Sequence, residues 1–358
     1  MASLIPKVVL SPFVTGPLLA VLAFGPPEVR GPLVEKLGSI KVPVDILVTV
    51  LKFLVPLGVV SLINNVLNGW ALRNWKWSSD STKDWVWGQE VAVITGGSNG
   101  IGAATAERLA LRGVKVAVLD VMDLSAELKA SPNIKYFNCD LRNREAVAKA
   151  ATEVRSTLGS PSILVNNAGI GNAGDILNLT PGALHAIFDI NLIAQWYTIQ
   201  EFLPDMIKKK KGHIMSVSSM SAFTGIAGIS DYCSIKAALT AFYESLNQEL
   251  KHRYHCPEIL TSIVYPLWTS TRLTEQLEED IKKASKTPIM KVGTVGDAMS
   301  KQILECKRGR IFLPNLFWTR AAPGLRGLPL WLQELIRDDT AKMVVQQGTS
   351  YEMGMEKQ

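Results

Sequence analysis

From Glu90 onward, short apolar runs rich in β-branched residues alternate with longer segments of helical periodicity. Because two parallel strands must be joined by a crossover of a dozen or more residues, usually a helix, this alternation predicts βαβ units. The fold class is therefore α/β, with one doubly wound parallel sheet. The seven predicted strands are VAVIT at 91–95, VKVAVLD at 114–120, IKYFN at 134–138, ILVNN at 163–167, HIMSVS at 213–218, ILTSIVY at 259–265 and RIFLP at 310–314.

A glycine-rich turn follows the first of these strands. Thr95 to Gly102 reads TGGSNGIG and leads into a helix that begins near Ile101. Gly96 and Gly100 let the backbone approach a pyrophosphate, and Gly102 lets the helix and the strand pack closely. The N-terminus of that helix then faces the anion, so the turn predicts a dinucleotide site.

The second strand ends in Asp120, eighteen residues beyond Gly102. At this place a carboxylate accepts hydrogen bonds from the adenosine ribose hydroxyls, and it would repel a 2′-phosphate. Neither Ser98 and Asn99 in the turn nor the two residues after Asp120 supply a cation for such a phosphate. The sequence therefore predicts NAD as the cofactor, with NADP as the alternative.

A phenol and an ammonium lie one helical turn apart in YCSIK, Tyr232 to Lys236, the only such pair among the seven tyrosines. Side chains four apart on a helix are about 5 to 6 Å from each other. At an effective dielectric constant near 20, a unit charge at this range favours the phenolate by about 3 kcal/mol, or about two pKa units. With an oxidised nicotinamide nearby, we expect this phenol to titrate close to neutrality and to take a proton from an alcohol.

Two polar motifs follow the fourth and fifth strands, NNAG at 166–169 and SVSS at 216–219. Both lie at carboxyl ends of strands, where a doubly wound sheet binds its ligands. With the glycine turn and YCSIK, they make the chain resemble the classical short-chain dehydrogenase/reductase family from about Val91 to Leu313, in the family's order and spacing. The resemblance implies a Rossmann fold and NAD(P)-dependent oxidation of CH–OH groups.

The resemblance also implies roles for individual residues. Ser219 matches the serine that orients the carbonyl, and Tyr232 matches the general acid/base. Lys236 matches the lysine that holds the nicotinamide ribose, and Asn191, in FDINL, the asparagine that supports a water-linked proton relay to it. Family members commonly pair two subunits through the helices that bear Asn191 and Tyr232, so a homodimer is implied as well.

Further cofactor contacts are implied by the same matches. Asp140, in NCDL, matches a residue beside the adenine, and Asn167 one that stabilises the sheet near the cofactor. Pro266 and Thr271 match the ends of the family's PGxxxT loop, but Leu267 replaces its glycine, so this loop is expected to differ in shape. The full cofactor-binding set is Gly96, Ser98, Asn99, Gly100, Ile101, Gly102, Asp120, Asp140, Asn167, Ala168, Tyr232, Lys236, Pro266 and Thr271.

The amino-terminal segment is apolar. Residues 8–27 contain no charge but several prolines, and a second apolar tract at 42–67 carries Asp45 and Lys52. Five tryptophans interleaved with basic residues follow, at positions 70–87, which is typical of a membrane interface. We expect membrane attachment through a hairpin or a single span, with a soluble helical extension as the alternative.

The predicted organisation is a membrane-associated extension at 1–88, a Rossmann-type domain at 89–314 and an apolar cap and tail at 315–358. Apolar residues also dominate where the family shapes its substrate pocket, although core packing would explain them equally well. These residues are Met220, Ala222, Phe223, Ile226, Ile229, Leu267 and Trp268. Together with the apolar extension, they favour a lipophilic alcohol or ketone as substrate.

The layout most resembles the membrane- and lipid-droplet-associated branch that contains retinol dehydrogenases and 17β-hydroxysteroid dehydrogenases. A retinoid, a steroid or a fatty alcohol would fit, at the endoplasmic reticulum or a lipid droplet. Two alternative functions are also compatible with the sequence. One is an NADPH-dependent lipid ketoreductase, and the other is a non-catalytic membrane or lipid-droplet scaffold that retains the nucleotide-binding fold.

Charge and metal-ligand patterns exclude other classes. The net charge is +6, but the basic residues are spread along the chain without interleaved aromatic residues, which argues against nucleic-acid binding. The one basic block, 208–211, is expected to face solvent at a helix C-terminus. Four cysteines and four histidines show no metal-ligand spacing, so no metal is predicted.

Overall fold

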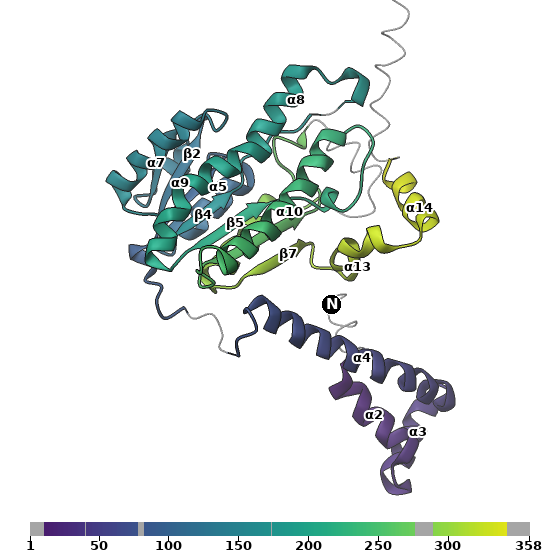
Figure 1. Cartoon of the computed structure of the whole chain (residues 1–358). Helices are drawn as coiled ribbons and strands as arrows, with labels where there is room; N and C mark the ends of the chain where they lie inside the picture. The colour runs from purple at the N-terminus through teal and green to yellow at the C-terminus, as the bar shows by residue number, and fades with distance from the viewer. Residues whose placement is uncertain (1–10, 40, 78–81, 173, 276–288, 342–358) are drawn as a thin grey trace, which may run out of the picture. The chain divides into compact units, whose positions relative to one another are not determined.

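The computed structural model describes residues 11–39, 41–77, 82–172, 174–275 and 289–341 (Figure 1). The chain divides into two compact units, Met1–Ser79 and Asp80–Gln358. The division falls nine residues before the boundary predicted at 88/89, and Trp85 and Trp87 pack against the core of the second unit. The segment between the second apolar tract and the sheet therefore belongs partly to the α/β unit.

The first unit is helical. Its helices are α2 (Pro12–Phe24), α3 (Pro27–Ser39) and α4 (Val44–Leu72), and α2 packs on α4. Proline begins both α2 and α3, where a missing N–H costs nothing, and the two helices meet at 107°. The most apolar window of the 29-residue α4 has a mean hydropathy of 2.5 and is only 11% buried, so the length and composition of this helix suffice to cross a membrane.

The five tryptophans form two separate groups. Trp70 lies 5.1 Å from Trp75 and 4.9 Å from Trp77, measured between ring centroids, at the end of α4. Trp85 and Trp87 stack at 5.3 Å in the second unit, where the Lys211 ammonium lies 4.7 Å above the Trp85 ring. Only the first group continues the apolar helix as an interfacial belt would.

Lys211 is not a freely solvated cation, contrary to the expectation for this basic block. Its Nζ donates to the Glu90 carboxylate at 2.5 Å and to the Asp84 carbonyl at 2.7 Å. Glu90 is buried and also accepts a hydrogen bond from the Ser162 hydroxyl at 2.6 Å. These contacts hold the segment before β1 against the amino ends of the strands.

A seven-stranded parallel sheet forms the second unit, with the order β3-β2-β1-β4-β5-β6-β7. The predicted fold class and all seven strands are confirmed. The strands are β1 (Val91–Thr95), β2 (Lys115–Asp120), β3 (Ile134–Asn138), β4 (Ile163–Asn166), β5 (His213–Val217), β6 (Leu260–Pro266) and β7 (Gly309–Leu313). Their central members are buried on both faces, as a sheet covered by helices requires.

Helices cover the two faces of this sheet (Figure 1). Along β1, Val91 and Val93 belong to one core cluster, whereas Ala92 and Ile94 belong to the other, because successive side chains point to opposite faces. The first face carries α7 (Arg144–Leu158), α9 (Ala194–Lys209) and the second half of α10 (Ser230–His252). The other face carries α5 (Gly100–Ala110) and α12 (Val292–Leu304), which pack on each other.

The strand order reverses between β1 and β4, so the loops after these strands diverge at the carboxyl edge of the sheet. Shorter elements border this edge. These elements are α6 (Ala126–Lys129), η2 (Ile176–Asn178), α8 (Pro181–Phe188), the π-helical η3 (Asp189–Ile193), η4 (Met220–Ala222), α13 (Phe317–Ala321), η6 (Ala322–Gly327) and α14 (Leu330–Ala341). Side-chain oxygens cap the N-termini of α5, α6, α7 and α8, and they belong to Asn99, Ser125, Asn143 and Thr180.

Candidate active site

One cavity of about 1010 Å³ lies at the carboxyl edge of the sheet, and almost all the predicted site residues line it. Of the predicted cofactor and catalytic residues, Ser98, Gly102 and Asn191 do not line it. Those that do are Gly96, Asn99, Gly100, Ile101, Asp120, Asp140, Asn167, Ala168, Ser219, Tyr232, Lys236, Pro266 and Thr271. The tertiary structure thus brings four separate sequence motifs to one cavity.

The glycine turn is held by close backbone contacts. Gly96 has φ of +61°, and a side chain there would meet the Ala168 backbone at 2.7 Å. Asn167 donates from Nδ2 to the carbonyls of Thr95 (3.1 Å) and Gly96 (3.0 Å). A side chain at Gly102 would overlap this Asn167 amide and the Gly96 carbonyl. Gly102 therefore makes room for the turn itself, whereas the sequence predicted helix–strand packing.

Asp120 is tied to the glycine turn. Its carboxylate accepts hydrogen bonds from the backbone N–H groups of Ser98 and Met122, both at 3.0 Å. The Ser98 hydroxyl in turn donates to the Met122 carbonyl at 2.6 Å. Ser98 thus acts by joining the turn to the residues after β2. The half-buried carboxylate still faces the cavity, and each of its oxygens retains a lone pair for a ligand.

A cation that the local sequence does not reveal lies beside this segment. The Arg272 guanidinium is 3.3 Å from the Met122 sulfur, although the two residues are 150 positions apart. Both residues line the cavity. The residues near Asp120 indeed supply no cation, but the loop after β6 does. Only the packing of that loop brings Arg272 beside the residues that follow Asp120.

Asp140 is already paired with a neighbouring cation. Its carboxylate accepts hydrogen bonds from the Arg142 guanidinium, the shortest at 2.6 Å, and from the Arg142 backbone N–H at 3.0 Å. These hydrogen bonds lower the pKa of Asp140, and those from the Arg142 side chain have the largest effect. The carboxylate therefore stays ionised at the cavity wall, with part of its hydrogen-bonding capacity taken by Arg142.

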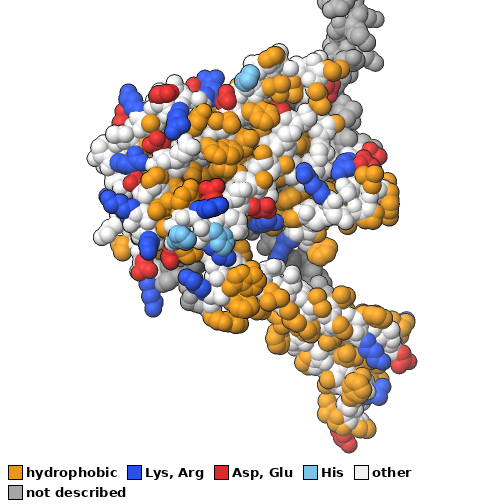
Figure 2. Space-filling view, viewed as in Figure 1, with side chains coloured by type: hydrophobic (Ala, Val, Ile, Leu, Met, Phe, Trp, Pro, Cys, Tyr) orange, Lys and Arg blue, Asp and Glu red, His pale blue; other side chains and the backbone are white. Residues whose placement is uncertain are grey.

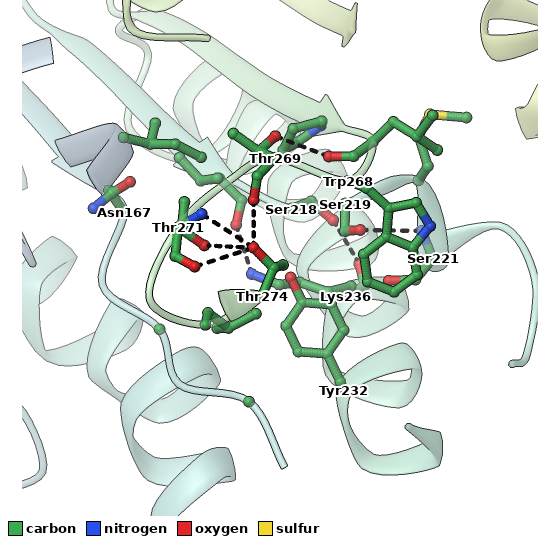
Figure 3. Close-up of a pocket in the computed structure, with 18 of the residues that line it drawn as sticks. Asn167, Ser218, Ser219, Ser221, Tyr232, Lys236, Trp268, Thr269, Thr271 and Thr274 are labelled. Atoms are coloured by element: carbon green, nitrogen blue, oxygen red, sulfur yellow. Dashed lines mark hydrogen bonds between the residues drawn. The ribbon is translucent and has the colours of Figure 1, made fainter. Parts of the chain in front are cut away.

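Tyr232 and Lys236 project from the first turns of α10 toward the end of β5 (Figure 3). Lys236 is 4% exposed, and its Nζ donates to the Val217 carbonyl at 2.9 Å. The same Nζ lies 5.1 Å from the centroid of the Tyr232 ring. Ser219 follows β5 on the same side of the cavity, and its Oγ accepts a hydrogen bond from the Ser221 N–H at 3.2 Å.

Burial, not the neighbouring ammonium, dominates the titration of this pair. Desolvation raises the pKa of Tyr232 to about 12, and a hydrogen bond with Ser219 offsets this only in part. Desolvation lowers the pKa of Lys236 to about 8. The lysine therefore loses its charge before the phenol ionises. Without a bound cofactor, the Lys236 ammonium alone does not bring the pKa of this phenol close to neutrality, and the expectation for the pair beside an oxidised nicotinamide stays a prediction.

Asn191 acts on the loop after β4. It lies in the π-helical η3 and is fully buried. Its Oδ1 accepts from the Ile170 N–H and its Nδ2 donates to the Ile170 carbonyl, both at 2.8 Å. Both ends of the side-chain amide are thus occupied by the backbone of a residue that lines the cavity. A sequence pattern cannot show this contact, because the partner is backbone.

The loop after β6 is organised by Thr274, a residue that the sequence analysis missed. The Thr274 hydroxyl donates to the Thr269 carbonyl at 2.7 Å and accepts from the Thr271 N–H at 3.0 Å (Figure 3). This places the Thr271 methyl 3.6 Å from where a side chain at Gly100 would lie. Leu267, which replaces the family's glycine, packs against an apolar cluster at the cavity wall.

The other end of the cavity has apolar walls. Six of the seven residues expected there line it, and the exception is Ala222, which is buried and accepts a hydrogen bond from Arg326 at 3.3 Å. The carboxyl-terminal helices complete this wall. They contribute Phe317, Trp318, Ala321, Ala322, Leu325, Leu328, Ile336 and Thr340.

Several known proteins are similar to this chain in sequence. A family model described as short chain dehydrogenase matches residues 90–282. Dehydrogenase RED2 of Cochliobolus heterostrophus is 34% identical over 209 residues, which cover 58% of this chain and 79% of that protein. Epidermal retinol dehydrogenase 2 of Mus musculus is 32% identical over 52% of this chain and 62% of its own length. Estradiol 17-beta-dehydrogenase 11 of Rattus norvegicus is 31% identical over 51% of this chain and 63% of its own length.

Among solved structures, the ligand-free aldohexose dehydrogenase of Thermoplasma acidophilum superposes with a TM-score of 0.53 at 25% identity. The match covers 63% of this chain and 92% of the other. This likeness supports the fold assigned to the chain.

Proposed function

Because the chain belongs to the short-chain dehydrogenase family and is an oxidoreductase by that membership, we propose that it transfers hydride between a lipophilic alcohol or ketone and NAD at a membrane. The observation that carries this proposal is the meeting of Ser219, Tyr232 and Lys236 in the same cavity that the glycine turn and Asp120 line. A nicotinamide dinucleotide, when bound, supplies the hydride-accepting ring.

The residues that line the cavity fit such a cofactor. The backbone from Gly96 to Ile101 and the N-terminus of α5 would hold the pyrophosphate. Asp120 would accept hydrogen bonds from the adenosine ribose, Asp140 would lie beside the adenine, and Lys236 would hold the nicotinamide ribose.

The chain's own residues supply the proton chemistry of the proposal. Ser219 donates a hydrogen bond to the substrate oxygen, and Tyr232 takes the hydroxyl proton during oxidation and returns it during reduction. Lys236 exchanges its proton with solvent and, while charged, favours the phenolate. Asn191 contributes by fixing Ile170 at the cavity wall, and a water-linked relay from it to Lys236 remains part of the proposal.

The rate of alcohol oxidation is expected to depend on the first proton that the Tyr232–Lys236 pair loses. Burial lowers the pKa of Lys236 to about 8, and the singly deprotonated pair includes the phenolate–ammonium form that accepts a proton. At saturating NAD, we expect kcat/KM for oxidation to rise about tenfold per pH unit below this value and to level above it. Ketone reduction should show the opposite trend. A flat profile from pH 6 to pH 10 would contradict this prediction.

Cofactor choice is expected to depend on the charge of Asp120. Asparagine there keeps one acceptor but loses a charge-assisted hydrogen bond, so kcat/KM with NAD should fall about tenfold or more. With NADP it should rise, because repulsion of a 2′-phosphate is removed. Asp123→Asn is the matched control, since Asp123 is exposed and forms its ion pair with Lys129.

The NADP alternative has its own structural basis in Arg272, beside Met122. If the unmodified protein prefers NADP and Arg272→Ala removes that preference, the cofactor assignment is wrong and Arg272 is the cation that binds the phosphate. If Arg272→Ala leaves the ratio between NAD and NADP unchanged, this alternative fails.

A lipophilic substrate is supported by the apolar walls of the cavity and by the names of the retinol and estradiol dehydrogenases similar to this chain. Membrane attachment is supported by α4. The proposed location is the endoplasmic reticulum or a lipid droplet, and a homodimer is the proposed assembly.

NADH formation in detergent micelles with retinol, hydroxysteroids and long-chain alcohols tests the activity. Cofactor binding without turnover on any of them would favour the scaffold alternative.

A further inference from the structure

The carboxyl-terminal helices have apolar residues on two sides. Their inner residues line the cavity, as described above. On the outside, large side chains stay exposed to solvent, namely Phe317 (82%), Leu330 (67%), Trp331 (66%), Leu335 (59%) and Trp318 (46%). Figure 2 shows apolar side chains gathered over α14. We call these five residues the C-terminal apolar face.

The helix α14 carries cavity-lining residues and exposed apolar residues on neighbouring sides. Ile336 and Thr340 are four apart and line the cavity, whereas Trp331 and Leu335, also four apart, are exposed. Residues at this spacing lie on one side of a helix, so α14 carries both an inner and an outer stripe. Phe317 and Trp318 belong to both sides, since each lines the cavity and is exposed.

The charge of this segment indicates what kind of surface it fits. Residues 315–341 contain three arginines and three acidic residues, so the segment has no net charge. Exposed tryptophan, phenylalanine and leucine on a short helix are typical of elements that lie in the interface of a membrane. Without net charge, such binding would depend on apolar burial and not on anionic headgroups.

We propose that the C-terminal apolar face docks on a phospholipid bilayer and that the cavity receives its substrate from the lipid. The continuity between the exposed face and the cavity wall favours lipid over a second copy of the chain, because a lipophilic substrate needs an apolar route. Attachment of the first unit to a membrane would hold this face at a high effective concentration near lipid. The substrate route rests on the proposed function, whereas docking itself does not.

Docking can be measured without activity. The full chain carrying Trp331→Cys, labelled with an environment-sensitive fluorophore, is reconstituted into phosphatidylcholine vesicles. Leu111→Cys is the matched control, because Leu111 is 78% exposed at the end of α5, and the four native cysteines are buried. We expect blue-shifted emission at position 331, quenched by nitroxide-bearing lipids and unaffected by salt, with neither effect at position 111.

Either of two fluorescence results would overturn the docking proposal. One is equal emission and equal lipid quenching at positions 331 and 111. The other is shielding of the label at 331 that depends on protein concentration and not on lipid quencher, which would mean that a second copy covers the face. A requirement for anionic lipid would also contradict it, because the segment has no net charge.

The substrate route is tested with Leu330→Gln, Trp331→Gln and Leu335→Gln combined, since none of these residues lines the cavity. For a long-chain alcohol supplied in vesicles, kcat/KM is expected to fall about tenfold or more. For a short, water-soluble alcohol, kcat/KM of this triple variant should stay unchanged. In the control Leu111→Gln, kcat/KM should stay unchanged for both alcohols. An equal loss for both alcohols would overturn the route. Absence of turnover in the unmodified protein would refute the proposed function and leave the docking result standing.

Discussion

Tyr232→Phe is expected to lower kcat for alcohol oxidation by about 10²- to 10⁴-fold, the range for loss of a positioned general acid/base. The substitution removes only the hydroxyl, so the ring stays in its place above the Lys236 ammonium. Affinity for NADH should change little, because the glycine turn and Asp120 are untouched. Steady-state kinetics with NAD and the best alcohol of the panel, together with NADH fluorescence titration, provide the measurement.

The control for this substitution is Tyr243→Phe on the same helix. Tyr243 is buried, and it does not line the cavity. Tyr243→Phe should leave kcat within about twofold of the unmodified protein, because a side chain outside the cavity takes no part in proton transfer. If Tyr232→Phe were as active as Tyr243→Phe, Tyr232 would not be the acid/base, and the proposed mechanism would be wrong.

Lys236→Met is expected to lower activity and, at the same time, to stabilise the fold below pH 8. Burial lowers the pKa of this ammonium from 10.5 to about 8, which corresponds to a cost of about 3 kcal/mol while the group is charged. Methionine has a similar length and avoids this cost. The Val217 carbonyl loses its donor, which costs about 1 kcal/mol, so the net gain is about 2 kcal/mol.

The sign of this effect depends on pH. The ammonium is charged in both the folded and the unfolded chain below pH 8, so the cost is fully present there. Between pH 8 and pH 10.5 the folded chain loses the proton first and the cost disappears. The stability gain of Lys236→Met should therefore be largest near pH 6 and absent above about pH 10.5. Urea unfolding in detergent, followed by circular dichroism at several pH values, measures it.

Activity of Lys236→Met should fall about 10²-fold or more, and the inflection near pH 8 in the oxidation profile should vanish. Lys209→Met is the matched control, because Lys209 is exposed at the end of α9 and makes one long hydrogen bond, to the Ser160 carbonyl at 3.3 Å. It should change neither stability nor the pH profile. A destabilised Lys236→Met at pH 6 would refute the burial argument.

The sequence by itself determined the sheet and the motifs on it. Strands such as VAVIT and ILVNN are recognisable because a central parallel strand, buried on both faces, needs a continuous run of β-branched residues. Glycine at 96 and 102 is recognisable because only glycine tolerates the contacts of the turn. Helical spacing likewise places Tyr232 and Lys236 side by side.

Only the tertiary structure decided how those residues behave. The order in which Tyr232 and Lys236 ionise follows from burial, and burial results from packing that no spacing reveals. The position of Arg272 beside Met122 and the cavity wall made by α13, η6 and α14 join segments far apart in the chain. Local patterns reflect the hydrogen bonding and exposure of neighbouring residues, whereas the charge and shape of a site depend on contacts made when distant segments pack together.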